Sequence, residues 1–362
     1  MNKLKIRPRA RFPGRLDPAQ VRHAFKTGLA AVLTLLLCTA LDLKQGYWAV
    51  ISAVIVMQAN LGGSLAAGWS RVLGTGVGAV LGTASLYLFG SSPLSLGAAL
   101  FTTILICAYM TFLHDSFRLA GITAAIVILM APGSSGYFVL GLERFIEISL
   151  GVGAAMLVSF LVLPSRAGVG LRKGLARGQE ELAALYERVV FGGLDGKRDE
   201  PGIERARNDF FKTRDRNRKL LAEAGREPLG LRRRNQILVS LVHFQDRLYE
   251  DIHSLDLAGK GFKPGGLQTW MEGEFRLLAK AASRGMRALG NGLLSNREGL
   301  DGVELVLALK EAEKGLLAMR KAKASAQYEL DQAVHFFAFY FSLKEAAAEV
   351  AVMLPRLGRS NG

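Results

Sequence analysis

AVISAVIVMQANLGGSLAAGWSRVLGTGVGAVLGTAS, residues 49–85, is matched 73 positions later by ITAAIVILMAPGSSGYFVLGLERFIEISLGVGAAMLV, residues 122–158. Identical residues align at this offset, among them Val54 with Val127, Ile55 with Ile128, Met57 with Met130, Arg71 with Arg144, and Gly78 with Gly151. In each copy an apolar run stops at the methionine, passes through a glycine-rich break and resumes after the arginine. Repeated, interrupted apolar segments are typical of secondary transporters. The repeat therefore predicts a membrane transport protein with a 3+3 inverted repeat.

Charge divides the chain into two regions. Residues 24–163 are almost free of charge, whereas residues 166–362 are rich in it. An apolar helix needs about 20 residues to cross a hydrocarbon core of roughly 30 Å. Six apolar stretches are candidates for spans: 25–41, 47–57, 72–89, 94–113, 119–131 and 145–163. The second and fifth stretches are short, and each is expected to continue past its break, over 47–69 and 118–139.

The sequence predicts an all-α fold with a membrane part and a cytosolic part. The expected domains are a basic cytoplasmic N-terminus (1–22), a six-helix transmembrane domain (23–164) and a cytosolic helical domain (165–362). Apolar residues at helical spacing predict helices in the last domain. They are expected over 166–191, 203–224, 233–256, 267–289 and 303–354, the last broken once. About 190 residues are enough for a separate core.

Basic residues indicate the orientation in the membrane. The first 22 residues hold seven basic side chains and one acid, Asp17. Positive flanks stay in the cytoplasm, and an even number of spans returns the chain to the same side. We therefore expect a multi-pass inner-membrane protein with both termini cytoplasmic, and with Arg71 and Arg118 on the cytoplasmic side. The formal charge of +15 fits contact with the headgroups of the lipid bilayer, and no nucleic-acid partner is expected.

Arg71 and Arg144 are the main candidates for substrate binding. Each precedes a long apolar segment, so each is expected near a helix N-terminus, where free N–H groups and the helix dipole favour anions. In an inverted repeat Arg71 would lie near the cytoplasmic face and Arg144 near the outer face, with a positive ring at each mouth of an anion path. Two alternatives stay open: the arginines snorkel to the interface, or Arg144 pairs with Glu143 or Glu147.

Three more polar residues are candidates. Gln58 and Asn60 follow the second apolar stretch and are expected to bind substrate, because broken helices present polar groups to a cavity. Alternatively a helix simply ends there at the interface. The matching break is 132–136. Glu147 lies about one turn inside the last span and is a candidate for proton coupling, unless it pairs with Arg144.

Small and aromatic residues complete the apolar pattern. Gly74, Gly78 and Gly82 recur every four residues, and Gly151 echoes them in the second copy. That spacing predicts close packing of helices through a small face. Tyr47 and Trp48 are expected either at the level of the headgroups or as lining for an aromatic substrate.

Motifs for catalysis and cofactor binding are absent from the sequence. It contains no Ser/His/Asp set, CxxC pair, Walker motif or glycine fingerprint. Both cysteines, Cys38 and Cys107, fall inside apolar stretches, which favours packing thiols over a disulfide. We therefore expect no enzyme activity, no cofactor and no metal site.

Two segments resemble the fusaric-acid-resistance (FUSC) type of integral membrane transporter. YWAVISAVIVMQANLGGSLAAGWSRVLGTGVGAVLG (47–82) carries a Tyr-Trp-Ala-Val entry and an Arg-x-x-Gly-Thr-x-x-Gly pattern, and ERFIEISLGVGAAMLVSFLVLP (143–164) resembles the final span. That family includes aromatic acid exporters, and the plant aluminium-activated malate transporters are similar. The resemblance covers about residues 20–165 and implies export or permeation of organic anions. The bacterial exporters often have two membrane halves, so the single half here favours a homodimer.

Taken together, the sequence predicts an inner-membrane transporter that exports organic anions, aromatic carboxylates in particular. The first alternative keeps the fold and is a passive organic-anion channel. The second is a membrane-anchored scaffold or sensor, in which the helical cytosolic domain binds a partner.

Overall fold

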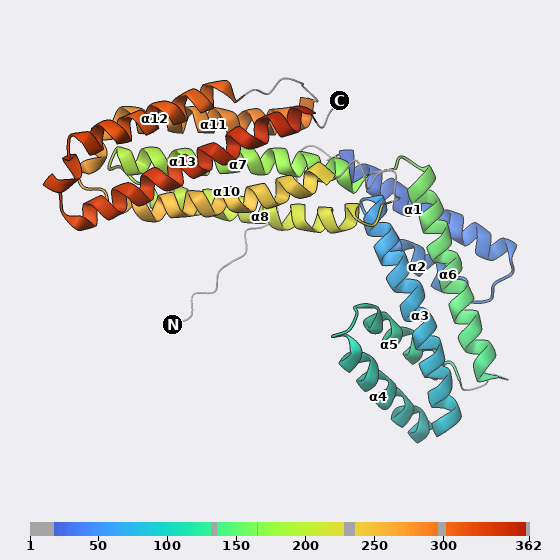
Figure 1. Cartoon of the computed structure of the whole chain (residues 1–362). Coiled ribbons are helices and arrows are strands. Elements are labelled where there is room, and N and C mark those ends of the chain that lie inside the picture. The colour runs from blue at the N-terminus through green and yellow to red at the C-terminus, as the bar shows by residue number, and fades with distance from the viewer. Residues whose placement is uncertain (1–17, 132–135, 165, 228–235, 296–301, 360–362) are drawn as a thin grey trace. The chain divides into compact units, whose positions relative to one another are not determined.

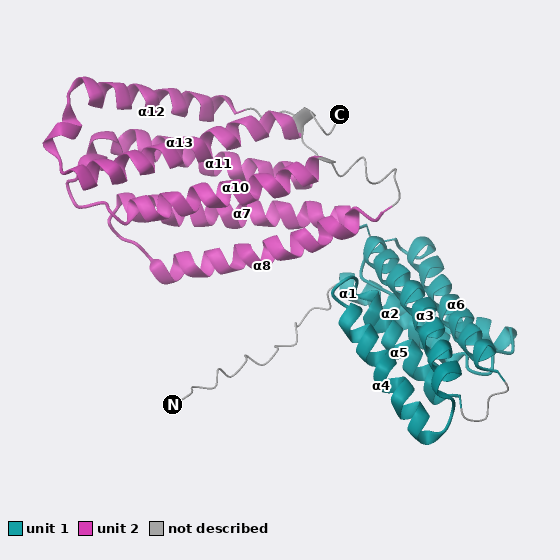
Figure 2. Ribbon diagram, turned by 60° about the horizontal axis from the view of Figure 1, so that its bottom comes forward, with its two compact units in different colours: residues 1–166 teal, residues 167–362 magenta. Residues whose placement is uncertain are grey.

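The computed structural model describes residues 18–131, 136–164, 166–227, 236–295 and 302–359. These residues form twelve α-helices and two 3₁₀ helices, and none of them lies in a β-strand. The predicted all-α class is therefore confirmed. The chain divides into two compact units, residues 1–166 and 167–362 (Figure 2), each described here by itself.

Unit 1 is apolar and contains the repeat. Its helices are α1 (Pro18–Ala40), α2 (Tyr47–Val56), α3 (Leu61–Phe89), α4 (Pro93–Met110), α5 (Ser116–Leu129) and α6 (Tyr137–Leu161). Among the described residues, α1, α3, α4 and α6 are long and apolar enough to cross a membrane. α2 and α5 have only 10 and 14 residues, or about 15 and 21 Å at about 1.5 Å per residue. The six-span arrangement with a cytosolic domain stays a prediction.

The helices of unit 1 pack as two equivalent sets of three. The first set is α1, α2 and α3, and the second is α4, α5 and α6. In the first set, α1 and α2 contact each other and both pack on α6; in the second set, α4 and α5 contact each other and both pack on α3. α3 and α6 contact each other and run in opposite directions (Figure 1). A two-fold axis that exchanges antiparallel helices is perpendicular to them, which is the relation found in inverted repeats. The short helix of each set thus packs on the long helix of the other.

A polar cap decides where α3 begins. Asn60 is the N-cap residue, and its Oδ1 accepts a hydrogen bond of 2.8 Å from the backbone N–H of Gly63, as asparagine does at helix starts. Gly90 ends the helix with a φ of 83°, a conformation that favours glycine. The expected start of the third span at residue 72 is wrong, because the cap at Asn60 begins one continuous helix of 29 residues.

Glycines permit the close approach of the two sets. A Cβ atom added to Gly78 would lie 2.8 Å from a side-chain carbon of α5, and one added to Gly151 would lie 2.7 Å from the carbonyl carbon of Ala49 on α2. Gly74 and Gly82 also face α5. A larger side chain at these positions would push the short helices away from α3 and α6.

Unit 2 is a bundle of long helices around one apolar core. Its described elements are α7 (Ala167–Leu194), α8 (Glu200–Ala224), α10 (Gln236–Gly259), η2 (Leu267–Met271), α11 (Glu272–Ser295), α12 (Val303–Lys321), η3 (Ala324–Gln327) and α13 (Leu330–Arg359). A helix lies in each segment where apolar spacing predicts one, and the last segment is broken between α12 and α13. The stripe along α10, which includes Leu241, Phe244, Leu248 and Ile252, is buried.

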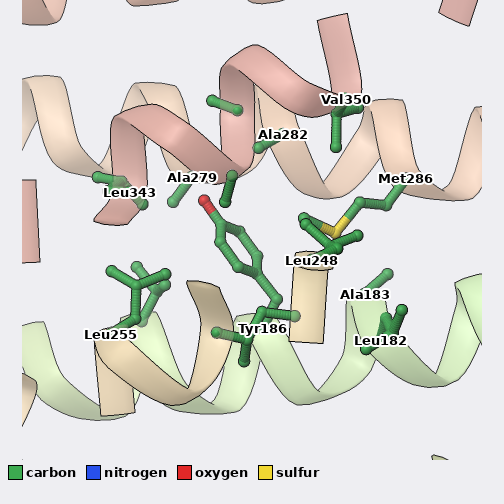
Figure 3. Close-up of a cluster of buried hydrophobic side chains, with 14 of the residues drawn as sticks. Leu182, Ala183, Tyr186, Leu248, Leu255, Ala279, Ala282, Met286, Leu343 and Val350 are labelled. Atoms are coloured by element: carbon green, nitrogen blue, oxygen red, sulfur yellow. The ribbon is translucent and has the colours of Figure 1, made fainter. Parts of the chain in front are cut away.

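Tyr186 on α7 places a polar group in the middle of this core. Its ring lies among the side chains of Leu248, Leu255 and Met286 (Figure 3), and the residue is fully buried. The hydroxyl has no hydrogen-bond partner among the described residues. Burial therefore raises the pKa of Tyr186, and the hydroxyl destabilises the folded state.

We expect Tyr186→Phe to stabilise the protein. A buried polar group without a partner costs about 1–3 kcal/mol, and phenylalanine fills the same space without the hydroxyl. Thermal unfolding of the full chain in detergent, followed by circular dichroism, measures the change. A lower unfolding temperature for the variant would show that the hydroxyl has a partner that stabilises the folded state.

Asp251 on α10 makes the stability of unit 2 depend on pH. Burial, followed by the carboxylates of Glu349 and Glu345 on α13 and of Glu250, raises the pKa of Asp251 to about 7, and Arg247 opposes the rise. In the unfolded chain the pKa of an aspartate is about 3.9. Because the folded-state pKa is higher, the unfolded state loses its proton first, and stability falls as the pH rises from about 4 to about 7.

We expect Asp251→Asn to remove this loss of stability. The amide carries no charge at any of these pH values, so the variant should unfold at a higher temperature than the wild type at pH 8 and at a similar temperature at pH 4. Melting curves of both proteins at the two pH values provide the measurement. Equal unfolding temperatures at pH 8 would show that the pKa of Asp251 is not raised.

Candidate functional site

Arg71 is buried in the interior of α3. The helix begins at Leu61, about three turns earlier, so the predicted position near a helix N-terminus is wrong. The residue is 2 % exposed, which does not fit a side chain that snorkels to the interface. Its Nη2 donates a hydrogen bond of 3.4 Å to Oγ of Ser52 on α2, and its Nε has no partner among the described residues.

Arg144 and Glu147 form a buried ion pair on α6. This helix begins at Tyr137, so Arg144 also lies about two turns inside its helix and not at the N-terminus. Nη1 of Arg144 is 2.6 Å from Oε2 of Glu147, and the two side chains are 1 % and 6 % exposed. Of the alternatives that the sequence left open for Arg144, the structure thus contains the ion pair with Glu147, three residues further along the helix. The pair is formally neutral as a unit.

The two arginines are equivalent in the repeat but differ in charge balance. At the 73-residue offset, Gly74 on α3 occupies the position of Glu147 on α6. Arg71 therefore has no carboxylate one turn on, and it makes no ion pair with the residues that the structure describes. A buried charge without a counter-charge is costly. An incoming anion would lower that cost at Arg71 and would have to compete with Glu147 at Arg144.

The polar residues of the first break hold the connection between α2 and α3. The backbone N–H of Gln58 donates to Oγ of Ser64 at 2.9 Å, and its Nε2 donates to the carbonyl oxygen of Ile55 at 3.1 Å. Asn60 caps α3. These contacts explain the polar residues locally, and substrate binding by Gln58 and Asn60 stays a prediction. In the matching break, 132–136, residues 132–135 lie outside the described residues.

Lys26 on α1 is a buried cation that was not among the residues predicted from the sequence. It is 1 % exposed, and its Nζ has no hydrogen-bond partner within the described part of the chain. Ala30, one turn further on, packs with Ala53 of α2 and Val152 of α6, so Lys26 lies toward the same interior. A lysine at the start of the first apolar stretch was the signal that could have indicated it.

Two cavities of unit 1 are lined by residues other than these buried charges. A cavity of about 490 Å³ lies between α3 and α6 and includes Thr83 and Phe145. A larger one, of about 630 Å³, is lined by α2, α4, α5 and the turn after α4. Trp48, for which aromatic lining was one of two expectations, contributes to the larger cavity. Arg118 also lines it, although the sequence indicated only a cytoplasmic flank for this residue.

Comparison with known proteins extends the resemblance noted in the sequence. The sequence profile of the Fusaric acid resistance protein family matches residues 20–342. A UPF0421 protein of Halalkalibacterium halodurans is 32 % identical over 174 residues, which cover 47 % of this chain and 48 % of the relative. One from Staphylococcus epidermidis is 32 % identical over 171 residues, which cover 46 % and 50 %. Aluminum-activated malate transporter 14 of Arabidopsis thaliana is 28 % identical over 194 residues, which cover 49 % and 36 %.

These matches differ in how much they cover. The chain spans about half the length of the UPF0421 relatives that it matches, whereas the family profile includes both copies of the repeat and most of unit 2. Together with the four helices of the described residues that are long and apolar enough to cross a membrane, the profile identifies a membrane protein. The suspected resemblance is confirmed, and the chain belongs to the Fusaric acid resistance protein family.

Proposed function

We propose that this protein transports organic anions across the inner membrane, and that it exports aromatic carboxylates. The observation that carries the proposal is the buried guanidinium of Arg71, which has no counter-charge among the described residues. Membership of the Fusaric acid resistance protein family and similarity to a protein named as a malate transporter support it. A fixed cation inside an apolar unit stabilises an anion that has left water.

In this proposal the two arginines act in sequence along one path. Arg71 attracts the carboxylate on the cytoplasmic side, and Gln58 and Asn60 at the break between α2 and α3 offer polar groups beside it. Arg144 receives the anion toward the outer side. The antiparallel relation of α3 and α6 (Figure 1) supports this order, because it separates equivalent positions along the membrane normal.

Glu147 would couple transport to protons. While its carboxylate pairs with Arg144 at 2.6 Å, the arginine is neutralised and attracts an anion weakly. A proton on Glu147 would break the ion pair and leave the guanidinium positive. Protonation and anion binding at Arg144 would therefore favour one another, so that anion binding there would depend on pH.

We further propose a homodimer whose termini both lie in the cytoplasm. Each chain supplies one apolar unit with its pair of repeats, and unit 2 follows α6 within six residues. The basic N-terminal residues and the even number of expected spans support the orientation. Lipid and a small organic anion are the proposed partners.

Flux through proteoliposomes tests the proposed function. The purified full chain would be reconstituted and loaded with radiolabelled benzoate or malate, and efflux would be followed with and without a pH gradient at a clamped voltage. Efflux that the proton gradient accelerates supports a coupled transporter. Flux that depends on voltage but not on the pH gradient would show that the protein is a passive organic-anion channel. The absence of flux of both anions would favour the membrane-anchored scaffold or sensor.

A further inference from the structure

The cavity of unit 1 that is lined by Trp48 and Arg118 has the composition of a site for an amphipathic anion. It measures about 630 Å³, within the range of about 300–1,000 Å³ of small-molecule sites. Its walls are mainly apolar, and they include Ile104, Phe117, Ile126 and the indole ring of Trp48. Such walls can accommodate the apolar body of a ligand.

Charge in this cavity has a single sign. Arg118 is the only charged residue among those that line it, and no carboxylate is part of the lining. Among the described residues, the guanidinium of Arg118 makes no ion pair, although Asp115 lies three positions earlier on the same chain segment. A free guanidinium beside apolar walls favours a ligand with a carboxylate at one end, which it can hold with two parallel hydrogen bonds.

The location of the cavity fits the repeat. Trp48 comes from the first turn of α2, in the first set of three helices, whereas Arg118 comes from the first turn of α5, in the second set. Binding sites of transporters with inverted repeats lie between the repeats and beside short or broken helices. The peptide dipoles in the first turn of α5, which contains Arg118, add to the positive potential of its guanidinium.

From these observations we infer that the cavity between α2, α4 and α5 binds an aromatic carboxylate, with the ring against Trp48 and the carboxylate on Arg118. This site is distinct from Arg71 and Arg144, which do not line the cavity. The inference rests on the proposed function, since the ligand would be the transported anion. An acidic phospholipid, with an acyl chain in the cavity and a phosphate on Arg118, is the competing occupant.

The structure supplies variants that separate charge from shape. Arg118→Gln removes the cation and Arg118→Lys retains it. Ala108 lines the cavity and is exposed, so Ala108→Phe fills the space without disturbing the core. Ala98 is also exposed on α4 but does not line the cavity, and Ala98→Phe is the matched control. Lys44→Gln removes an exposed cation elsewhere.

The test is quenching of Trp48 fluorescence by 4-iodobenzoate in the full chain, held in phosphatidylcholine nanodiscs. Trp69 and Trp270 are replaced by phenylalanine so that only Trp48 reports, because a heavy-atom quencher acts at contact. We expect saturable quenching that becomes about tenfold or more weaker in Arg118→Gln, persists in Arg118→Lys, disappears in Ala108→Phe and is unchanged in both control variants. The neutral 4-iodobenzamide should bind Arg118→Gln as well as it binds the wild type.

Three outcomes would overturn the inference. The first is quenching that does not saturate, and the second is quenching that is the same in Arg118→Gln and Ala108→Phe as in the wild type. The third is loss of quenching when phosphatidylglycerol is added, together with retention of this lipid by the wild type but not by Arg118→Gln. That result would show that the cavity binds lipid. Benzoate flux of the same variants keeps the two proposals apart: wild-type flux without saturable quenching removes the site and leaves the transporter.

Discussion

Gly151→Ala is expected to lose most of its folded, monodisperse protein. The added Cβ would lie 2.7 Å from the carbonyl carbon of Ala49, and this neighbour is helix backbone, which cannot rotate away. Overpacking of this kind costs typically 1–3 kcal/mol and occasionally more, so about 3 kcal/mol is expected here. Fluorescence-detected size-exclusion chromatography of a tagged full chain, followed by a melting curve, measures the loss.

A glycine on the same helix provides the control for this experiment. Gly153 is exposed and has nothing within 4 Å of an added Cβ, so Gly153→Ala should give wild-type yield. Gly78→Leu, at the equivalent position of the first copy, should fail as Gly151→Ala does, since Gly78 faces α5. If Gly151→Ala folded as well as Gly153→Ala, the close approach of α2 and α6 would be wrong.

Arg71→Gln is expected to reduce anion flux by about tenfold or more while the protein still inserts and folds. Glutamine can keep a hydrogen bond to Ser52 but carries no charge. Hydrogen bonds to charged groups contribute about 1.5–3 kcal/mol. If that interaction stabilises the anion at the top of its transport barrier, its loss slows the flux by about 10–100-fold. Benzoate efflux from proteoliposomes of known protein content gives the measurement.

Two variants make the result at Arg71 specific. Arg71→Lys keeps the positive charge and should retain part of the flux, because lysine offers a point charge without the planar fork of arginine. Lys44→Gln removes an exposed cation in the connection between α1 and α2 and should leave flux unchanged. Wild-type flux in Arg71→Gln, with normal yield and insertion, would take this residue out of the path.

The sequence predicted the all-helical class and the break after the second apolar stretch because both are local properties. Apolar spacing records which face of a helix is buried, and the Leu241–Ile252 stripe of α10 is buried as its period predicts. The start of α3 was predicted wrongly, since apolar residues continue on both sides of Arg71. Only the capping hydrogen bond from Gly63 to Asn60 marks the true boundary, and a residue pattern does not reveal which polar side chain makes a cap.

For the candidate site too, the sequence predicted local features, and contacts between distant residues came only from the structure. The alignment of Arg71 with Arg144 found both buried guanidinium groups, and a carboxylate at i+3 was visible beside only one of them. That Arg71 reaches Ser52, 19 residues away in the chain, depends on how α2 lies against α3. Trp48 and Arg118 line one cavity because the short helix of each set packs against the long helix of the other set.

By itself, the sequence determined that this chain is helical, that residues 24–163 form an apolar region, and that this region contains a repeat, because composition and period follow from residues close together in the chain. Only the tertiary structure decided which cation keeps an uncompensated charge and which side chains share a cavity. Electrostatic compensation and enclosed volume are set by neighbours in space: Ser52 of the same set contacts Arg71, whereas Trp48 of one set and Arg118 of the other line one cavity.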